Sequence, residues 1–451
     1  MNRPAWKLLV EGLGKIERAE VAVHPLMLFV GDNNSGKSYL ASLLWGLVAT
    51  PRTLPMPAGG ALSACEAWLT RRRAEREHGI VYELSTEDRA LFTRLFNELI
   101  REELVKHVFN NPGMTADRIE VEPLHERAVK VAWEPLDRAT HAGENVLYLR
   151  EDMVSHSRQG ESYRAFVLKH LASMVTLGLL PGKASSMFYE EGNPYEGDPI
   201  YLPASRSSFM LLYKEVARRI FQSEPVPTMT RPTLQFIDLL AFGLEKREGP
   251  YAAEAALLER GLDGRVELSS GAVGINEYAY YPAGSSPPLS HLSLASSLVT
   301  ELAPIILVLR HLSGFPILVL EEPEAHLHPK VQRLLAQVIV RLVRKGLYVW
   351  ITTHSENFCQ QINDFMKIGA VPDRARLAAE MQKTLGYAYG EQDYLTPADV
   401  AGYEFVNQGE HSVVRALAKH PDGLVMPTFN REMVAIAREV TFLEQQLDGE
   451  A

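Results

Sequence analysis

Residues that could bind a phosphate group lie close together near the start of the chain. The segment Gly31 to Ser38 reads Gly-Asp-Asn-Asn-Ser-Gly-Lys-Ser, which fits the pattern of a phosphate-binding loop. Apolar residues from Leu26 to Val30 predict a buried strand before it, and apolar residues from Leu40 to Leu47 predict a helix after it. In this setting backbone N–H groups turn inward, and the start of the helix adds partial positive charge. The sequence therefore predicts a site for a nucleoside triphosphate.

The predicted nucleotide-binding residues are consecutive. They are Gly31, Asp32, Asn33, Asn34, Ser35, Gly36, Lys37, Ser38 and the following Tyr39. We expect Lys37 to reach the β- and γ-phosphates, and the Ser38 hydroxyl to ligate Mg²⁺. The alternative is a glycine-rich turn that fits the pattern by accident, which happens in roughly one chain of this length in a hundred. The flanking strand and helix patterns favour the nucleotide site.

A second group of reactive residues follows the apolar segment Pro316 to Leu320, which predicts another buried strand. The carboxylates of Glu321 and Glu322 come directly after it. Phosphoryl transfer needs one acidic group to hold the metal and one to orient and deprotonate the attacking water. We assign the metal to Glu321 and the water to Glu322. The alternative is a solvated helix start, where acidic residues are also common.

A third strand is predicted from Leu347 to Ile351, and it is followed by Thr352, Thr353 and His354. A histidine after a buried strand is usually structural. Because this one follows the acidic pair so closely along the chain, we predict that its imidazole reaches the γ-phosphate.

Ser296 and Ser297 open a predicted apolar helix from Leu298 to Leu312. Small polar residues are ordinary helix caps, but they also suit an anion-binding helix start. Ser269 and Ser270 compete for this role. They are followed by a strand-like sequence and lie farther from Glu321, so Ser296 and Ser297 are preferred.

The overall composition limits the possible classes of protein. The chain has 451 residues, of which 46% are hydrophobic, and a net charge of −10. It can bury a large core, and no overall positive charge draws it to nucleic acid or membrane, although the net charge leaves a local basic groove open. Its two cysteines give neither a disulfide framework nor a metal motif. No signal peptide and no stretch of about 18 uncharged apolar residues is evident. We therefore expect a cytoplasmic protein.

The order of these patterns predicts an α/β fold with a mixed and parallel sheet flanked by helices. Residues 1–50 and 200–360 form the two parts of this head. Between them, residues 51–199 predict an insertion of helices and short antiparallel strands. Residues 361–451 predict a small C-terminal α/β region.

Four motifs in this order resemble a known family. They are Gly31–Ser38, Ala295–Ser297, Leu318–Glu324 and Thr353–Ser355. The combination is similar to the ABC-type ATPase heads of the SMC, RecF and OLD group. The two asparagines of the loop, and the run Glu-Glu-Pro-Glu-Ala-His-Leu-His-Pro, look most like the OLD-type branch. That branch includes AAA family ATPases of bacterial anti-phage systems, and the likeness covers about residues 5–50 and 200–360.

The resemblance implies an ATP- and Mg²⁺-dependent ATPase that works as a homo-oligomer, with at least two heads enclosing two ATPs. Ser296 and Ser297 would then act on the γ-phosphate held by the partner copy, and the loop containing His326 and His328 would cross the interface. The alternative that these two histidines together bind a metal ion is less favoured. Arg206 lies where related ATPases have a Pro-x-x-Arg strand end, which implies either a γ-phosphate contact or a structural ion pair.

Three functions remain open at this point. The first is a switch whose ATP-driven dimerisation controls a separately encoded effector, such as a nuclease or toxin, in anti-phage defence. The second is a RecF-like repair ATPase that binds DNA across a closed dimer. The third is a scaffold that holds ATP and rarely hydrolyses it. No Asp-x-Asp pair of an OLD nuclease domain follows His354, so we expect the nuclease to be absent from this chain.

Overall fold

The fold is built around one large sheet. The computed structural model describes residues 6–74, 81–124, 128–133, 146–149, 163–178, 195, 197–222, 228–270, 274–284, 292 and 295–449. The nine-stranded sheet has the order β5-β1-β2-β14-β13-β3-β12-β11-β8. Its strands are β1 (Trp6–Leu13), β2 (Ile16–Ala22), β3 (Leu26–Gly31), β5 (Arg118–Pro123), β8 (Ile200–Leu202), β11 (Ile317–Glu321), β12 (Tyr348–Thr352), β13 (Val400–Gln408) and β14 (His411–Ala416).

The sheet is mixed. Strands β13, β3, β12, β11 and β8 run parallel to one another, while the β1–β2, β1–β5 and β13–β14 pairs are antiparallel. Every residue of β3, β11 and β12 is buried. Parallel strands covered on both faces read as continuous apolar runs, which is why these strands were easy to predict. The expected α/β class is confirmed.

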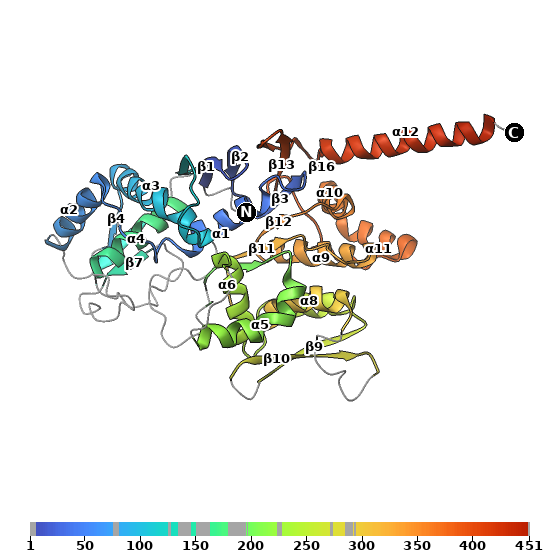
Figure 1. The fold of residues 1–451 in the computed structure, drawn as a ribbon, viewed down its shortest axis with the longest axis horizontal. Coiled ribbons are helices and arrows are strands. Elements are labelled where there is room, and N and C mark those ends of the chain that lie inside the picture. The colour runs from blue at the N-terminus through green and yellow to red at the C-terminus, as the bar shows by residue number, and fades with distance from the viewer. Residues whose placement is uncertain are drawn as a thin grey trace.

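Helices cover both faces of the sheet (Figure 1). Side chains of β3 alternate between two cores, with Leu28 in one and Phe29 in the other. The core containing Phe29 is closed by α1 (Lys37–Ala49), α3 (Thr86–Phe109) and α4 (Tyr163–Leu177). The core containing Leu28 is closed by α8 (Ser297–His311), α9 (Pro329–Arg344) and α10 (Glu356–Ala370).

The predicted insertion contains α2 (Gly60–Ala74), α3, α4 and a small sheet of β4 (Val81–Glu83), β6 (Lys130–Trp133) and β7 (Val146–Leu149). The Ser85 side chain caps α3 in a capping box with Asp88. The expected antiparallel arrangement is wrong for β6 and β7, which pair in parallel. Residues 134–145 separate these strands, and nothing in the local pattern fixed the strand direction.

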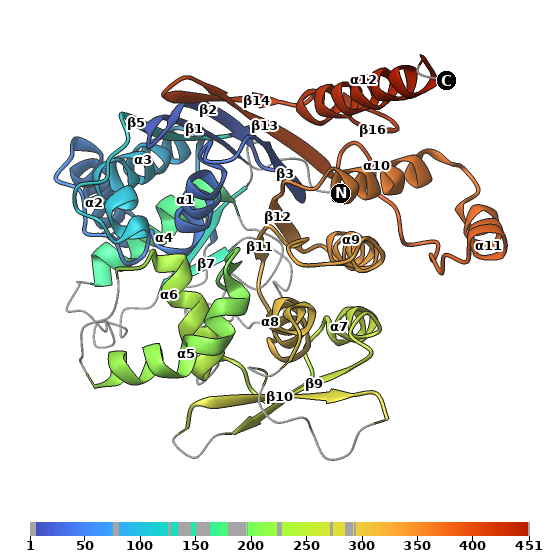
Figure 2. The same ribbon diagram turned by 45° about the vertical axis from the view of Figure 1, so that its right-hand side comes forward.

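A lower lobe follows β8 (Figure 2). It holds α5 (Arg206–Phe221), α6 (Arg231–Asp238), the π-helix η2 (Leu239–Gly243), α7 (Ala252–Glu259) and the hairpin of β9 (Gly264–Ser270) and β10 (Asn276–Pro282). Ser269 and Ser270 lie in β9, whereas Ser296 and Ser297 lie at the start of α8. Only the second pair is therefore at a helix N-terminus.

The C-terminal segment, expected as a small α/β region, contributes two strands to the main sheet. After α10 and α11 (Arg374–Leu385), the chain returns to the main sheet, where β13 lies between β3 and β14. The short strands β15 (Lys419–His420) and β16 (Gly423–Leu424) then lead to α12 (Pro427–Gly449). Strand β5 of the insertion also joins the main sheet, beside β1. The sheet thus crosses the boundaries expected near residues 50, 200 and 360.

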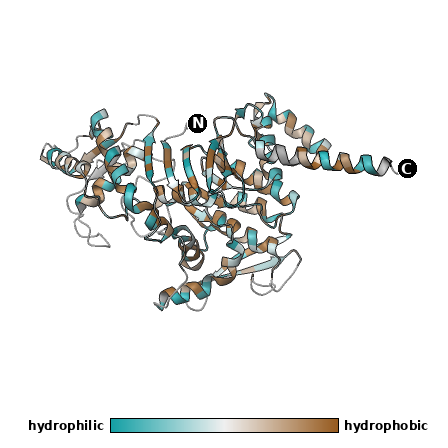
Figure 3. Cartoon of the chain, turned by 45° about the horizontal axis from the view of Figure 1, so that its top comes forward, coloured by the Kyte–Doolittle hydropathy of each residue, from teal (hydrophilic) through white to brown (hydrophobic). Residues whose placement is uncertain are grey.

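Helix α12 projects from the body and carries both hydrophobic and hydrophilic residues (Figure 3). Its exposed apolar side chains include Val434, Ile436, Val440, Phe442 and Leu443. None of the described helices is long and apolar enough to cross a membrane.

The position of β13 makes the C-terminal strands part of the fold. A chain shortened to residues 1–398 would expose the edge of β3 and lose Tyr403 and Phe405, whose rings contact Phe29. We expect this chain not to fold cooperatively, because an uncovered central strand leaves a ladder unpaired. Circular dichroism and thermal unfolding would measure the effect. A chain of residues 1–429, which keeps β13 and β14 but lacks most of α12, should unfold cooperatively like the full chain. Equal behaviour of the two shortened chains would contradict the prediction.

Candidate nucleotide-binding site

The glycine-rich loop joins β3 to α1, as predicted. Gly31 and Gly36 adopt positive φ angles of 119° and 96°, and Asn34 has a φ of 53°. A side chain at Gly31 would collide with the backbone of Phe405 in the neighbouring strand β13. Glycine is therefore required there both for its backbone angle and for the close approach of another strand.

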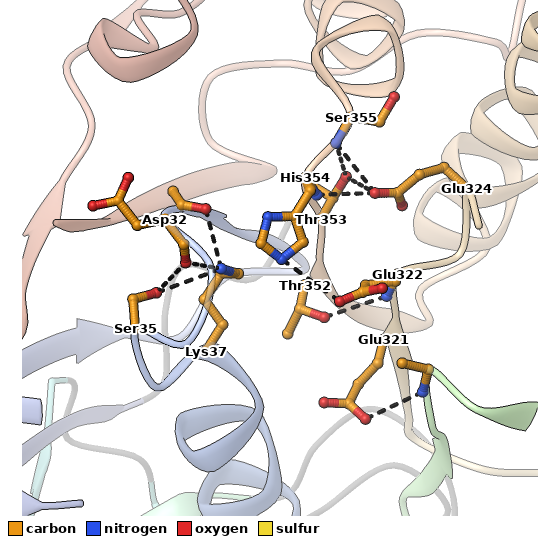
Figure 4. Close-up of polar contacts among 12 residues, drawn as sticks. Asp32, Ser35, Lys37, Glu321, Glu322, Glu324, Thr352, Thr353, His354 and Ser355 are labelled. Carbon is orange, nitrogen blue, oxygen red and sulfur yellow. Dashed lines mark hydrogen bonds and ion pairs between the residues drawn. The ribbon is translucent and has the colours of Figure 1, made fainter. Parts of the chain in front are cut away.

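Lys37 is the first residue of α1, and its side chain folds back over the loop (Figure 4). Its Nζ donates to the carbonyl oxygens of Gly31 at 3.1 Å and Asp32 at 2.5 Å. Burial lowers the pKa of Lys37 to about 8, and the negative charges of Glu322 and Asp32 partly oppose this shift. The Lys37 amine is therefore buried, and its hydrogen-bond partners are two carbonyl groups of the loop and the Ser35 hydroxyl.

Glu321 ends β11 and is 7% exposed. Its Oε2 accepts from the backbone N–H of Ala204 at 3.3 Å, while Oε1 is buried and has no hydrogen-bond partner among the described residues. Burial raises the pKa of Glu321, partly offset by the nearby hydroxyls of Ser38 and Tyr201. An unpartnered carboxylate oxygen near a loop serine is a donor set that fits a hard divalent cation, which in such sites takes its other oxygens from phosphate and water.

Glu322 and His354 face each other from neighbouring strand ends. The Oε1 of Glu322 lies 3.5 Å from Nε2 of His354, and the two side chains are 42% and 32% exposed. Burial and the charge of Lys37 lower the pKa of His354, with Glu322 acting in the opposite direction. Figure 4 shows the imidazole between Lys37 and Glu322. The structure therefore brings together the lysine, the acidic residues and the histidine predicted from separate segments.

Glu324 is a residue of this site that the sequence reasoning missed. Its Oε1 accepts from Thr353 Oγ1 at 2.6 Å and from the backbone N–H groups of His354 and Ser355 at 2.9 and 3.1 Å. Burial raises its pKa, and the bond from Thr353 acts against this. Glu324 thus fixes the backbone at the end of β12, where His354 begins. The signal was present, since Glu324 stands in the same acidic run as Glu321 and Glu322.

The C-terminal strands are the other part of the site that the sequence did not reveal. Asn407 of β13 and Ser412 of β14 both hydrogen-bond the glycine-rich loop. They lie more than 370 residues from it along the chain, and no motif marks them.

Arg206 does not take the predicted nucleotide-contacting position. Its side chain is fully buried, and its Nη2 lies 3.0 Å from Glu301 Oε2 in α8. Its guanidinium also donates to the backbone carbonyls of Glu301, Pro203, Glu321 and Glu322. All three guanidinium nitrogens bind groups within the chain. Of the two roles considered for Arg206, the structure therefore favours the structural ion pair over a nucleotide contact. Arg206 links the starts of α5 and α8 to the end of β11.

Ser296 and Ser297 lie apart from the loop. Both are exposed at the N-terminus of α8, and neither side chain caps that helix. Among the described residues, no hydrogen bond or ion pair joins them to Gly31–Ser38. The start of α8 is thus an open helix end that faces solvent in a single copy.

His326 and His328 do not form a metal site. His328 caps α9, accepting from the backbone N–H of Lys330 at 3.3 Å, and His326 is exposed with a φ of 57°. Within the described part of the chain, no three His, Cys, Asp or Glu residues are grouped so that they could hold a metal ion by themselves.

A family model described as an AAA ATPase domain matches residues 288–359. The matched segment includes Ser296, Ser297, Glu321, Glu322 and His354, and the glycine-rich loop lies beside it in the fold. The chain therefore carries a segment similar to an ATPase domain. The expected ATP hydrolysis is thereby confirmed.

Several solved structures are similar to this chain at low identity. The SMC head domain from Thermotoga maritima is 12% identical, with 92% of this chain and 98% of that one covered at a TM-score of 0.35. The Smc head domain with an extended coiled coil, derived from Pyrococcus furiosus and bound to the C-terminal domain of ScpA, is also 12% identical, with 96% and 98% covered at a TM-score of 0.37. An ATP-binding cassette of an ABC transporter is 10% identical, with 79% and 84% covered at a TM-score of 0.28. No curated protein matches the chain.

The buried ion pair of Arg206 gives a prediction for stability. Arg206→Ala leaves the carboxylate of Glu301 buried without its partner, so the free energy of unfolding should fall by about 3–5 kcal/mol. Denaturant titration would measure this. Arg218→Ala is the matched control, because Arg218 lies on the same helix with a 51% exposed side chain paired to Glu215, and it should change stability by less than about 1 kcal/mol. If Arg206→Ala lowered the free energy of unfolding no more than Arg218→Ala does, the structural role of Arg206 would be contradicted.

Proposed function

We propose that this ATPase is a dimeric switch, in which two copies close around two ATPs. The observation that carries the proposal is the division of the site. One cluster holds the loop, Glu321, Glu322 and His354, while Ser296 and Ser297 lie on an exposed helix end without contact to that loop. A helix N-terminus with free N–H groups and hydroxyls suits an anion. In this proposal the anion is the γ-phosphate held by the other copy.

Within one half of the site, each residue takes a distinct part. The N–H groups of the loop from Gly31 to Ser38 and the Lys37 ammonium bind the phosphates, with Tyr39 beside them. On binding, the Lys37 Nζ exchanges the carbonyls of Gly31 and Asp32 for phosphate oxygens, whose negative charge favours the ammonium form. Ser38 and Glu321 would hold Mg²⁺, which neutralises developing phosphate charge when bound.

Glu322 and His354 carry the hydrolytic chemistry in this proposal. The Glu322 carboxylate orients the attacking water and accepts its proton, because it is accessible and lies beside His354. The His354 imidazole, neutral at pH 7 because its pKa is lowered, donates a hydrogen bond to the γ-phosphate. The carboxylate of Glu324 keeps the His354 backbone in place for this contact.

The output of the switch is control of a separately encoded effector, such as a nuclease or toxin, in anti-phage defence. This part of the proposal rests on the resemblance of the motif set to OLD-type ATPases. A net charge of −10 gives no general attraction to DNA, so the RecF-like alternative is not preferred.

Mixing two inactive variants tests whether the site is shared between copies. Lys37→Ala disables the loop but keeps the serines, whereas Ser297→Glu places a carboxylate where the γ-phosphate of the partner would bind. A glutamate in the first turn suits the helix, so the second variant should fold normally. Each variant alone should lose ATP hydrolysis. An equimolar mixture should recover about a quarter of the parent rate, since half of the pairs contain one intact site out of two.

Phosphate release from the separate variants and from the mixture would measure this recovery. The matched control mixes Lys37→Ala with the double variant Lys37→Ala/Ser297→Glu, in which no pair contains an intact site, and it should stay inactive. If the first mixture also stays inactive although both proteins are folded, Ser297 does not act across a dimer.

A variant that binds ATP but cannot hydrolyse it should accumulate as the closed, ATP-bound dimer. Glu322→Gln keeps the size of the side chain but cannot accept a proton, so hydrolysis should fall by about 10²–10⁴-fold. With ATP and Mg²⁺, this variant should run as a stable dimer in light-scattering measurements, whereas Lys37→Ala should not. The product of an adjacent nuclease or toxin gene, expressed together with the chain, should copurify with one of these variants and not the other. Parent-like hydrolysis by Glu322→Gln would remove Glu322 from the catalytic role.

A further inference from the structure

The glycine-rich loop is held from outside by two strands that come late in the chain. The backbone N–H of Asp32 donates to the Phe405 carbonyl of β13 at 3.1 Å. In turn, the backbone N–H of Asn407 donates to Asp32 Oδ2 at 2.9 Å, and the Asn407 side-chain Nδ2 donates to the Asn33 carbonyl at 3.1 Å. From β14, Ser412 Oγ donates to the Ser35 carbonyl at 2.6 Å. Four hydrogen bonds thus connect the loop to this strand pair.

Three of these bonds take up oxygen atoms of the loop. They are a carboxylate oxygen of Asp32 and the carbonyl oxygens of Asn33 and Ser35. Such oxygens carry full or partial negative charge and would repel a polyphosphate if they turned toward it. Because a carbonyl and the N–H of the next residue belong to one rigid peptide plane, fixing these carbonyls also fixes the direction of the next N–H groups. The N–H groups of Asn34 and Gly36 are therefore oriented through bonds made by Asn407 and Ser412.

The loop needs this support because its own backbone is unusual. Asn34 has a φ of 53°, in a region that residues other than glycine seldom adopt. Gly31 and Gly36 supply two further positive φ angles, and glycine also allows many other conformations in the absence of restraint. A loop with this composition keeps a single shape only where hydrogen bonds hold it, and the bonds from β13 and β14 add to those that Ser35 and Lys37 make within the loop.

Ser412 is well placed for such a restraint. Its side chain is fully buried, and its backbone N–H donates to the Lys15 carbonyl in the β1–β2 turn at 2.7 Å. This second bond fixes Ser412 to the body of the sheet. Its hydroxyl therefore restrains the loop against a rigid part of the fold. Asn407, in contrast, is exposed at the end of β13, so a substitution there removes little packing.

We propose that Asn407 and Ser412 are positioning residues for nucleotide binding, and that they hold the glycine-rich loop in the shape that receives the phosphates. The inference rests on the proposed function only in that ATP binds at this loop. It adds the C-terminal strand pair to the machinery of the site. Neither residue touches the nucleotide; both act through the backbone of Asn33 and Ser35.

The test uses the full chain with the substitutions Asn407→Ala and Ser412→Ala, separately and together. The dissociation constant of a fluorescent, non-hydrolysable ATP analogue should rise about three- to tenfold for each single variant, as expected for the loss of one hydrogen bond. The double variant should show about the product of the two factors, because the bonds are separate. The KM for ATP should rise in parallel, while kcat at saturating ATP stays within about twofold of the parent, since the loop reaches its working shape once occupied.

Asn407→Asp distinguishes loss of the hydrogen bond to the loop from loss of side-chain packing. Aspartate has the shape of asparagine but no side-chain N–H, and it adds a negative charge beside Asp32. It should weaken nucleotide binding at least as much as Asn407→Ala. Gln408→Ala, at the next exposed position of β13, is the matched control and should bind like the parent. Thermal unfolding without nucleotide should show the two Asn407 variants within about 3 °C of the parent, because an exposed side chain contributes little to stability.

The possible outcomes are distinct. If the parent and Gln408→Ala bind the analogue and both Asn407 variants bind it equally well, the positioning role is wrong and the proposed function stands. A fall in kcat with unchanged KM in the Asn407 variants would also overturn the positioning role. If the parent itself binds no better than Lys37→Ala, the nucleotide site of the proposed function fails instead.

Discussion

The site depends on the register of three parallel strands. Glu321 of β11 pairs with Thr352 of β12, and Thr352 pairs with Phe29 of β3. Since the strands are parallel and in this register, their carboxyl ends lie next to one another at the same end of the sheet. The loop, the acidic pair and His354 each follow one of these ends, so a set of backbone hydrogen bonds brings the loop to side chains more than 280 residues later in the chain.

This dependence explains which parts of the site could be predicted from the sequence. A buried strand followed by reactive residues is a local pattern, and it is readable at Gly31, Glu321 and His354 alike. Their convergence follows from one further assumption, that parallel strands are neighbours. The class of fold and the members of the main cluster were therefore predictable. Glu324 was equally visible but was assigned no part, because its role lies in the backbone contacts it makes.

The remaining features depend on contacts that no local pattern encodes. Strand β13 is an apolar segment like many others, and its place between β3 and β14 is fixed by tertiary pairing alone. The same holds for the parallel pairing of β6 and β7. Arg206 is ambiguous for another reason, since a charged side chain after a strand suits both a phosphate contact and an internal ion pair. Its complete burial beside Glu301 decides between them, and burial of a single side chain is not readable from sequence.

The sheet order also determines how a signal could leave the site. Strand β3 is hydrogen-bonded to β12 on one side and to β13 on the other. Nucleotide bound at the end of β3 is therefore connected to the rest of the fold through the strands on both sides. One route runs through β12 and β11 to Arg206, which joins the acidic strand end to α8 and so to the exposed serines. The other runs through β13 and β14 to α12, whose exposed apolar side chains project from the body. Because neighbouring strands cannot shift past one another without breaking their ladders, a change at the loop acts on both routes together. In the dimeric switch that we propose, these connections would couple the closing of a second copy onto α8 to the exposed apolar side chains of α12.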